Sequence, residues 1–190
     1  PDAVREAAET IDAEAQRLDR LVTSVLDLSR IESGALQPDL EAYDLRELVE
    51  TAVTRLRPSI GDRPVSIELP DELPPVRVDA VLLDAVLANV LENAARHTPP
   101  GTALAIRAAC ERSDRITLRL ADNGPGVDPA EAEAVFQPFH TAKPPGQGTG
   151  LGLAIARELA EYHGWTLQMA GGPPKVPRNT FVLDMSRGTR

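Results

Sequence analysis

Several common sources of protein chemistry are scarce or missing in this 190-residue sequence. Its single cysteine, Cys110, excludes an internal disulfide and a multi-cysteine zinc site, and indicates a reducing compartment. Aromatic residues make up 3% of the chain, too few for a platform that stacks nucleic-acid bases. The net charge of −9 also disfavours nucleic acid, which attracts basic surfaces. No apolar run approaches the roughly 18–20 residues that cross a membrane, so membrane contact is expected only through segments outside this chain.

What the sequence does contain is a globular balance of 42% hydrophobic and 26% charged residues. Apolar residues recur at spacings of four and three over residues 3–31, which predicts one long helix that ends at Ser33-Gly34. A heptad pattern of this length favours a bundle or coiled coil with another chain or with a missing segment over a helix folded back on its own domain. Because the chain opens on Pro1 rather than methionine, we expect a fragment or a processed product.

After a connector at residues 35–44, the sequence predicts an α+β domain over residues 45–190. Asp44 and Asp79 precede apolar periodic runs and are expected to cap helices, the first of which should end at Pro58. Helices are predicted at residues 45–57, 80–96, 129–136 and 150–163, and strands at 65–69, 76–78, 103–109, 115–121, 165–170 and 179–184. The expected architecture is a two-layer sandwich, a mixed sheet covered on one side by helices and preceded by the long helix.

Three polar clusters in this domain carry candidate chemistry. Asn89 and Asn93 lie on one face of an apolar helix, where amide oxygens can complete the shell of a Mg²⁺ ion. Asp122 opens the turn Asp122-Asn-Gly-Pro-Gly126 straight after a strand and can accept a hydrogen bond from an exocyclic amine. The run Gly148-Thr-Gly-Leu-Gly-Leu153 leads into a helix whose free amides can hold phosphates, with Lys143 just before it.

Each cluster also has a plainer interpretation. The two asparagines fit a solvent-facing polar stripe, Asp-Asn-Gly is an ordinary turn sequence, and a glycine-rich stretch can be a simple connector. The connector is the weakest of these alternatives, because free amides at a helix N-terminus bind anions. The function is decided by the order and spacing of the clusters together.

In that order and spacing, the clusters resemble the ATP-binding catalytic domain of bacterial sensor histidine kinases, in the superfamily with gyrase, the heat-shock chaperone and MutL. The run Leu87-Ala-Asn-Val-Leu-Glu-Asn-Ala-Ala-Arg-His-Thr-Pro99 resembles the N box, Asp122–Gly126 the G1 box and Gly148–Gly152 the G2 box. Val135-Phe-Gln-Pro-Phe139 resembles the F box between them. The resemblance covers about residues 45–185 and implies a Bergerat-type ATP-binding fold.

The resemblance implies a role for each matching position. Asn93, supported by Asn89, would hold Mg²⁺, and Asp122 would accept a hydrogen bond from the adenine amino group of ATP. The other positions implied in ATP binding are Arg96, His97, Gly124, Gly126, Lys143, Gly148, Thr149, Gly150, Leu151 and Gly152. His97 stands where the family has a tyrosine, which argues against a metal or catalytic role for it. Phe136 and Phe139 would anchor the lid by packing.

One position separates the kinases from the ATP-hydrolysing branch of this superfamily. Those relatives place a glutamate four residues before the metal-binding asparagine, where it activates water. This chain has Asn89 there, and an amide takes up no proton near pH 7, so it cannot act as a general base. The sequence therefore favours kinase chemistry, with ATP hydrolysis near background.

The histidine that accepts the phosphoryl group in such kinases has no counterpart here, because His97, His140 and His163 each fit a surface or capping histidine. The resemblance places residues 1–34 in the second helix of an incomplete dimerisation and phosphotransfer domain, through which the full protein would form a homodimer. The chain should therefore bind Mg-ATP without phosphorylating itself. In the full protein, the γ-phosphoryl group would pass through a histidine to a response-regulator aspartate, in the cytoplasmic portion of a membrane-anchored sensor.

Three alternatives stay open at this point. The first is an ATP-hydrolysing member of the same superfamily, which Asn89 disfavours. The second is a degenerate kinase that acts only as a docking module, which the intact boxes disfavour without excluding a scaffolding role. The third is an anti-sigma type serine/threonine kinase, which shares the boxes but usually lacks a long dimerisation helix such as the one predicted at residues 3–31.

Overall fold

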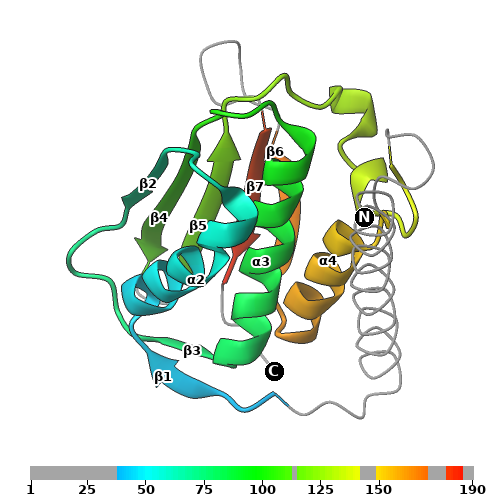
Figure 1. The fold of residues 1–190 in the computed structure, drawn as a ribbon. Helices are drawn as coiled ribbons and strands as arrows, with labels where there is room; N and C mark the ends of the chain where they lie inside the picture. The colour runs from blue at the N-terminus through cyan, green and yellow to red at the C-terminus, as the bar shows by residue number, and fades with distance from the viewer. Residues whose placement is uncertain (1–37, 113–114, 142–148, 171–178, 186–190) are drawn as a thin grey trace, which may run out of the picture.

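The computed structural model describes residues 38–112, 115–141, 149–170 and 179–185. These residues form a five-stranded sheet with helices on one face, and a separate two-stranded sheet at one end (Figure 1). The predicted α+β architecture of two layers is therefore confirmed. The long helix predicted over residues 3–31 lies outside the described residues.

The main sheet has the strand order β2-β4-β5-β7-β6. β2 pairs with β4 in parallel and the other neighbours pair antiparallel, so the sheet is mixed, as expected. The strands are β2 (Val65–Glu68), β4 (Leu104–Arg112), β5 (Arg115–Asp122), β6 (Thr166–Ala170) and β7 (Asn179–Asp184). The second sheet pairs β1 (Glu41–Tyr43) with β3 (Val76–Val78) antiparallel. Each predicted strand is present, and the hairpin of β4 and β5 is confirmed.

Three α-helices cover one face of the main sheet: α2 (Leu45–Ile60), α3 (Ala80–His97) and α4 (Gly152–Tyr162). Both predicted caps are present. Asp44 Oδ1 accepts from the Arg46 N–H at 2.8 Å, and Asp79 Oδ1 accepts from the N–H groups of the first turn of α3. These caps satisfy backbone donors that have no partner inside the helix.

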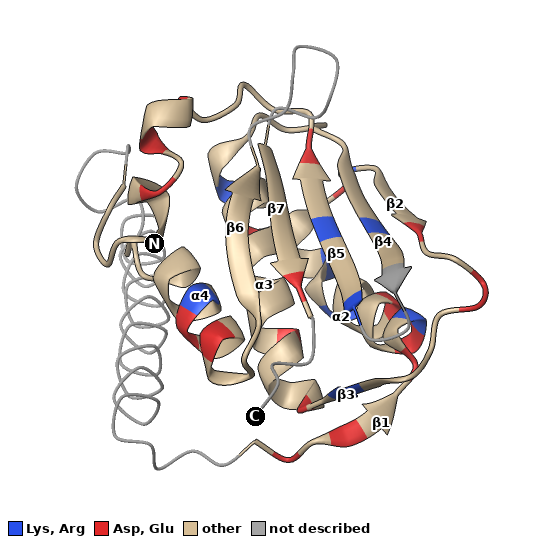
Figure 2. Cartoon of the chain, turned by 180° about the vertical axis from the view of Figure 1, so that it is seen from behind, with Lys and Arg blue, Asp and Glu red and all other residues tan. Residues whose placement is uncertain are grey.

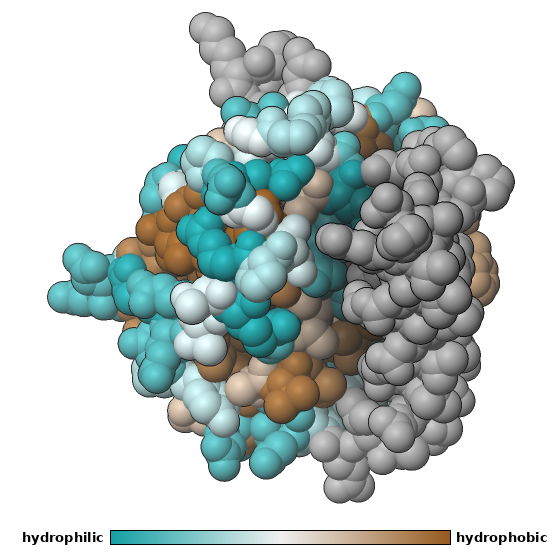
Figure 3. All heavy atoms as spheres, viewed as in Figure 1, coloured by the Kyte–Doolittle hydropathy of each residue, from teal (hydrophilic) through white to brown (hydrophobic). Residues whose placement is uncertain are grey.

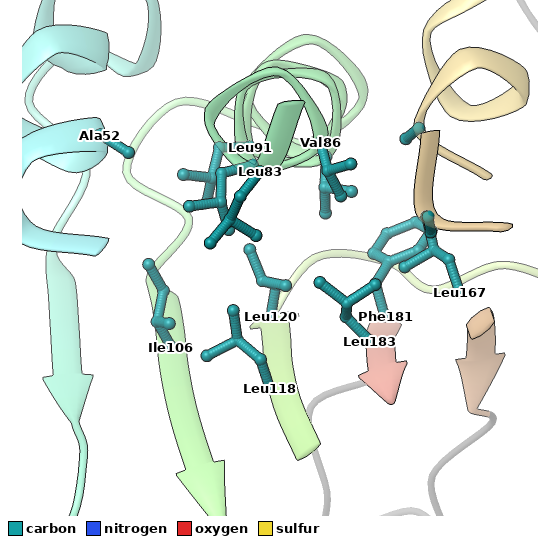
Figure 4. Close-up of a cluster of buried hydrophobic side chains, with 14 of the residues drawn as sticks. Ala52, Leu83, Val86, Leu91, Ile106, Leu118, Leu120, Leu167, Phe181 and Leu183 are labelled. Carbon is teal, nitrogen blue, oxygen red and sulfur yellow. The ribbon is translucent and has the colours of Figure 1, made fainter. Parts of the chain in front are cut away.

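The core lies between the helices and the sheet, where apolar residues alternate along the strands. Leu118 and Leu120 of β5 point toward α3 beside Phe181 and Leu183 of β7 (Figure 4). Each of these four side chains is at most 2% exposed. The opposite face of the sheet is exposed and carries charged residues (Figure 2). Arg107 of β4 and Arg119 of β5, for example, lie directly across from each other there. This alternation decides which strand residues can reach the helix layer.

Two predictions about local structure were wrong. The first helix does not end at Pro58 but continues to Ile60, which is 0% exposed, and the Gly61 N–H closes the last turn on Arg57 O at 2.9 Å. Burial of Ile60 outweighs the one backbone donor that proline lacks near a helix end. The predicted helix at 129–136 is instead two 3₁₀ turns, Pro129–Glu131 and Ala134–Phe136. Only Phe136 is buried there, so no apolar stripe supports a longer helix.

Surface features are modest on the side that carries the helices. Figure 3 shows small apolar patches separated by hydrophilic side chains over α2 and α3. Among the described residues, the large hydrophobic side chains that stay exposed are Leu40, Val81 and Phe139. No described helix is both long and apolar enough to cross a membrane. Cys110 lies in β4, one residue past the predicted strand, and is exposed.

Arg63 joins the C-terminal ends of α2 and α3. Its Nη1 donates to Ile60 O at 3.0 Å, and its Nη2 donates to Ala95 O at 2.7 Å and Thr98 O at 3.1 Å. One guanidinium thus satisfies carbonyl groups that both helix ends leave without intrahelical partners.

Replacing Arg63 by methionine is expected to lower the free energy of unfolding by about 2–3 kcal/mol, because several part-buried carbonyls lose a charged donor. Denaturant titration measures this loss. Arg55→Met is the matched control, since the Arg55–Asp84 ion pair at 2.6 Å lies on the surface and should contribute less than about 1 kcal/mol. Equal losses in the two variants would contradict a clamping role for Arg63.

His163 ends α4 and connects it to two other segments. Its ring stacks on Trp165 with centroids 4.1 Å apart. Its Nε2 accepts from the Asp79 N–H at 3.4 Å and its Nδ1 lies 2.9 Å from Leu159 O, so the neutral ring carries its proton on Nδ1. Burial lowers the pKa of His163, although the Leu159 hydrogen bond and the charge of Asp79 oppose this shift. The expectation of a capping role for this histidine fits these contacts.

The sign of this pKa shift predicts how stability depends on pH. The folded-state pKa lies below the unfolded value of 6.5, so the unfolded chain takes up the proton first as the pH falls. The contribution of His163 is therefore complete above pH 6.5 and is lost as the pH falls through the folded pKa. Denaturation curves between pH 8 and pH 5 should show this loss, and His163→Phe should remove it. A parallel pH dependence in the variant would contradict the assignment.

Candidate functional site

The buried row of β5 ends in a carboxylate. Leu118, Leu120 and Asp122 alternate onto the helix-covered face, and Asp122 is only 3% exposed. Its Oδ1 accepts hydrogen bonds from the Gly124 N–H and from Asn179 Nδ2, both at 2.9 Å. Its Oδ2 accepts none from the residues that the structure describes. A charged group thus stands at the end of the core with one oxygen oriented by the protein and the other available to a donor.

Burial has an electrostatic consequence for this carboxylate. Desolvation raises the pKa of Asp122 above its usual value of 3.8, and the two hydrogen bonds to Oδ1 partly offset the rise. Burying this charge lowers the free energy of unfolding, so its presence here indicates a role in ligand binding. Perturbed acids of this kind are concentrated at functional sites.

The predicted asparagines lie on α3 where it faces α4. Asn89 and Asn93 are half-buried one turn apart, whereas Arg96 and His97 are exposed in the last turn. Asn89 Nδ2 donates to Ala85 O at 2.9 Å, which leaves Oδ1 as the outward group of the amide. A Cβ built on Gly152 would lie 3.0 Å from Asn89 Oδ1, so this oxygen sits against the first residue of α4.

The glycine-rich run produces a helix start without a side-chain cap. Thr149 Oγ1 accepts from the Leu151 N–H at 3.2 Å, Leu151 is buried, and α4 begins at Gly152. Leu151 at the N-cap gives no side-chain hydrogen bond, so within the described residues the first N–H groups of this helix have no capping side chain and suit an anion. Two further predicted residues, Lys143 and Gly148, lie outside the described residues.

α3 brings the two loops of the site together. A Cβ on Gly124 would lie 2.6 Å from Thr98 Cγ2, at the C-terminal end of α3. Asn89, which lies against Gly152, is nine residues before Thr98 on the same helix. At 1.5 Å per residue, the two contacts are about 14 Å apart along the helix axis. The site therefore has a carboxylate at one end and amide groups at the other, separated by the length scale of a nucleotide.

Magnesium fits this donor set only as a partner of phosphates. Within the described ranges, no three His, Cys, Asp or Glu side chains group as a metal site. Asn89 Oδ1 and the amide of Asn93 are neutral oxygen donors that leave the charge of the ion to be balanced by a ligand. The residues present thus suit a nucleotide-bound ion and not an ion held by protein alone.

Sequence reasoning missed three residues around the site. Asn179 bonds Asp122 from a strand 57 positions further along the chain, Thr98 packs on Gly124, and Arg63 holds Thr98. The buried end of an alternating strand was the signal that could have found Asn179. Phe136 is buried and meets Phe181 edge-on at 6.1 Å, so it packs as predicted, and its role in anchoring the lid stays a prediction. Phe139 is 70% exposed, so the prediction that it packs was wrong.

Sequence comparisons match this chain to a family of ATPases and to sensor proteins. Residues 78–188 match the family described as histidine kinase-, DNA gyrase B-, and HSP90-like ATPase. The alginate biosynthesis sensor protein KinB of Pseudomonas aeruginosa is 33% identical over 187 residues, which cover 96% of this chain and 31% of that protein. The sensor-like histidine kinase SenX3 of Mycolicibacterium smegmatis is 32% identical over 191 residues, which cover 97% of this chain and 49% of that protein.

Solved structures share this fold. The mycobacterial sensor histidine kinase MprB has a TM-score of 0.67 and 29% identity, with 77% of this chain and 97% of that chain covered. Full-length ShkA in complex with AMPPNP has a TM-score of 0.77 at 24% identity, with 89% of this chain and 35% of that chain covered.

The curated relatives are longer than this chain, which spans about a third of KinB and half of SenX3. The matched residues include the Asp79 cap, the helices α3 and α4 and the strands β5 and β7 that build the site. The chain therefore belongs to the histidine kinase-, DNA gyrase B- and HSP90-like ATPase family, as an ATP-binding catalytic domain of the sensor histidine kinase type.

Proposed function

We propose that this chain binds Mg-ATP and donates the γ-phosphoryl group to a histidine on another helical segment, from which an aspartate of a response regulator receives it. In the transfer, the bond between the γ-phosphorus and the β–γ bridging oxygen breaks, a phosphorus–nitrogen bond forms on the histidine, and ADP leaves. The proposed location is the cytoplasm, where ATP is available. The similarity to the sensor-like histidine kinase SenX3 and to the sensor histidine kinase MprB supports the proposal.

The observation that carries the proposal is the pairing of Asp122 with the α4 N-terminus across α3. Asp122 is a buried acceptor suited to an amino group on a base, and the uncapped start of α4 suits phosphates. Gly124 lies so close to Thr98 and Asp122 that a side chain there would collide with both. The base would therefore meet backbone at this position.

The chain contributes positioning and charge neutralisation. Amide N–H groups of Gly152 and the following residues would donate to phosphate oxygens, and Arg96 would add positive charge at the exposed end of α3. Asn89 and Asn93 would hold the magnesium ion. When bound, that ion supplies positive charge that neutralises the phosphates during transfer.

Titration calorimetry with Mg-ADP and AMPPNP tests the binding step. The wild-type chain should bind both nucleotides, Asp122→Ala should abolish binding, and Asn93→Ala should bind without dependence on Mg²⁺. Glu92→Ala is the matched control, because Glu92 is next in sequence but points about 100° away from Asn93 around the helix. No binding by the wild-type chain would contradict the proposal.

ATP hydrolysis by this chain is expected to stay near background. The amide of Asn89 donates to Ala85 O and cannot take up a proton from water, so the site lacks a general base at that position. A phosphate-release assay on purified chain with Mg-ATP measures the turnover. Steady hydrolysis that Asp122→Ala abolishes would favour the ATP-hydrolysing alternative instead.

A further inference from the structure

Asn179 begins β7 directly opposite Asp122 of β5. Its Nδ2 donates to Asp122 Oδ1 at 2.9 Å in a buried contact. The asparagine is 7% exposed, and its Oδ1 is buried without a hydrogen-bond partner in the described part of the chain. One buried amide thus has a satisfied donor and an unsatisfied acceptor beside the carboxylate of the site.

The carboxylate fixes the orientation of this amide. An ionised carboxylate only accepts hydrogen bonds, so rotating the Asn179 amide by a half turn would set its Oδ1 against Asp122 Oδ1. Two acceptor oxygens would then lie at hydrogen-bond distance with no proton between them. Asn179 Oδ1 is therefore held as an acceptor for as long as Asp122 is ionised.

The sheet does not require a polar residue at this position. The two preceding pairs on the same face of these strands are Leu120 with Phe181 and Leu118 with Leu183, all buried. An apolar residue at position 179 would extend that row. An unsatisfied buried carbonyl oxygen instead costs stability, and such groups in native proteins call for a specific explanation.

Asp122 alone leaves the choice of base open. A carboxylate can accept from an amino hydrogen of adenine, but also from the ring N–H and amino groups of other purines. An amino group presents two hydrogens from one nitrogen. Two acceptors on neighbouring strands, one of them held in orientation by the other, can accept both.

On the basis of the proposed function, we propose that Asn179 is a base-specificity residue whose Oδ1 accepts the second hydrogen of the amino group that donates its first hydrogen to Asp122. The ligand class is a 6-aminopurine nucleotide whose amino group is unsubstituted. A 6-oxopurine would set its own oxygen against two acceptors, and a single N-methyl group would remove one of the two donors.

The test compares ADP with N6-methyl-ADP by titration calorimetry in the wild type, Asn179→Leu and Asn179→Ala. The wild type should bind ADP about tenfold more tightly than N6-methyl-ADP, because methylation leaves a buried acceptor without its donor. In Asn179→Leu, which has a similar volume and no acceptor, the ratio should fall to within about twofold. Asn179→Ala also lacks a side-chain acceptor and should show the same reduced ratio if the leucine variant does not fold.

If Asn179 had a purely structural role, its substitution would act through Asp122 and weaken the binding of ADP and N6-methyl-ADP equally. A ratio that stays near tenfold in the variants would therefore overturn the assignment. Equal affinity of the wild type for the two nucleotides would also overturn it, while leaving the proposed function intact. A wild-type chain that binds neither nucleotide would contradict the proposed function itself.

Discussion

Asp122→Asn is expected to weaken Mg-ADP binding about 100-fold, because a charged acceptor for the base is replaced by a donor. The substitution is nearly isosteric. The new amide can keep its Oδ1 toward the Gly124 N–H and Asn179 Nδ2, and it places an NH₂ group where Asp122 Oδ2 stood. The local hydrogen bonds are thus preserved and only the group offered to the ligand changes. Titration calorimetry measures the loss.

The same substitution should leave the free energy of unfolding undiminished, because burial penalises the charge that it removes. Desolvation sets the folded pKa of Asp122 above its unfolded value of 3.8. The folded chain therefore binds this proton more tightly, and the wild type should gain stability from this group as the pH falls through the folded pKa. Asp122→Asn should not show that gain in denaturation curves recorded from pH 7 downward.

Asp128→Asn provides the matched control for both measurements. Asp128 follows the turn after β5 and, like Asp122, accepts from a backbone N–H two residues on, at 2.9 Å from Ala130 N, but it is exposed. Its substitution should change neither ADP affinity nor the pH dependence. If Asp122→Asn binds ADP tightly, or lowers the free energy of unfolding strongly, the carboxylate stabilises the fold and does not bind the ligand.

Local periodicity was enough to predict most elements of this fold. Asp79 before an apolar run located α3 to within a residue at each end, and alternation located β5 and β7. The errors arose where a single long-range contact outweighed a local rule. Burial of Ile60 extended α2 past Pro58, and burial of Phe136 alone was too little to make a helix of residues 129–136.

The candidate site was predictable only where motif residues are close in sequence. Asp122 and Gly124, or Asn89 and Asn93, lie within a turn or a helical face that the sequence itself defines. Asn179 reaches Asp122 only through the pairing of β5 with β7, and strand register is set by tertiary packing. The predicted nucleotide-binding and metal-binding roles of all the site residues, including Arg96, His97, Gly126, Lys143 and Gly148, stay predictions.

Gly150→Ala is expected to weaken Mg-ADP binding about 100-fold, because losing a hydrogen bond to a charged phosphate costs about 1.5–3 kcal/mol. Gly150 has φ +65°, a conformation that alanine adopts only with strain. Its added Cβ would lie 2.6 Å from Phe139 C and 2.8 Å from His140 O, which are backbone atoms that cannot rotate away. The Phe139 N–H also donates to Gly150 O at 2.9 Å, so the two segments move together and the start of α4 is displaced.

Gly164→Ala separates this displacement from simple backbone strain. Gly164 follows the other end of α4 with φ +76°, and a Cβ there would meet nothing within 4 Å. Both substitutions should therefore cost about 1–2 kcal/mol of stability for the left-handed conformation. Only Gly150→Ala should also lose ADP affinity, because only there does the side chain collide with the backbone that sets the amides of α4. Equal affinities in the two variants would show that the helix start does not hold the phosphates.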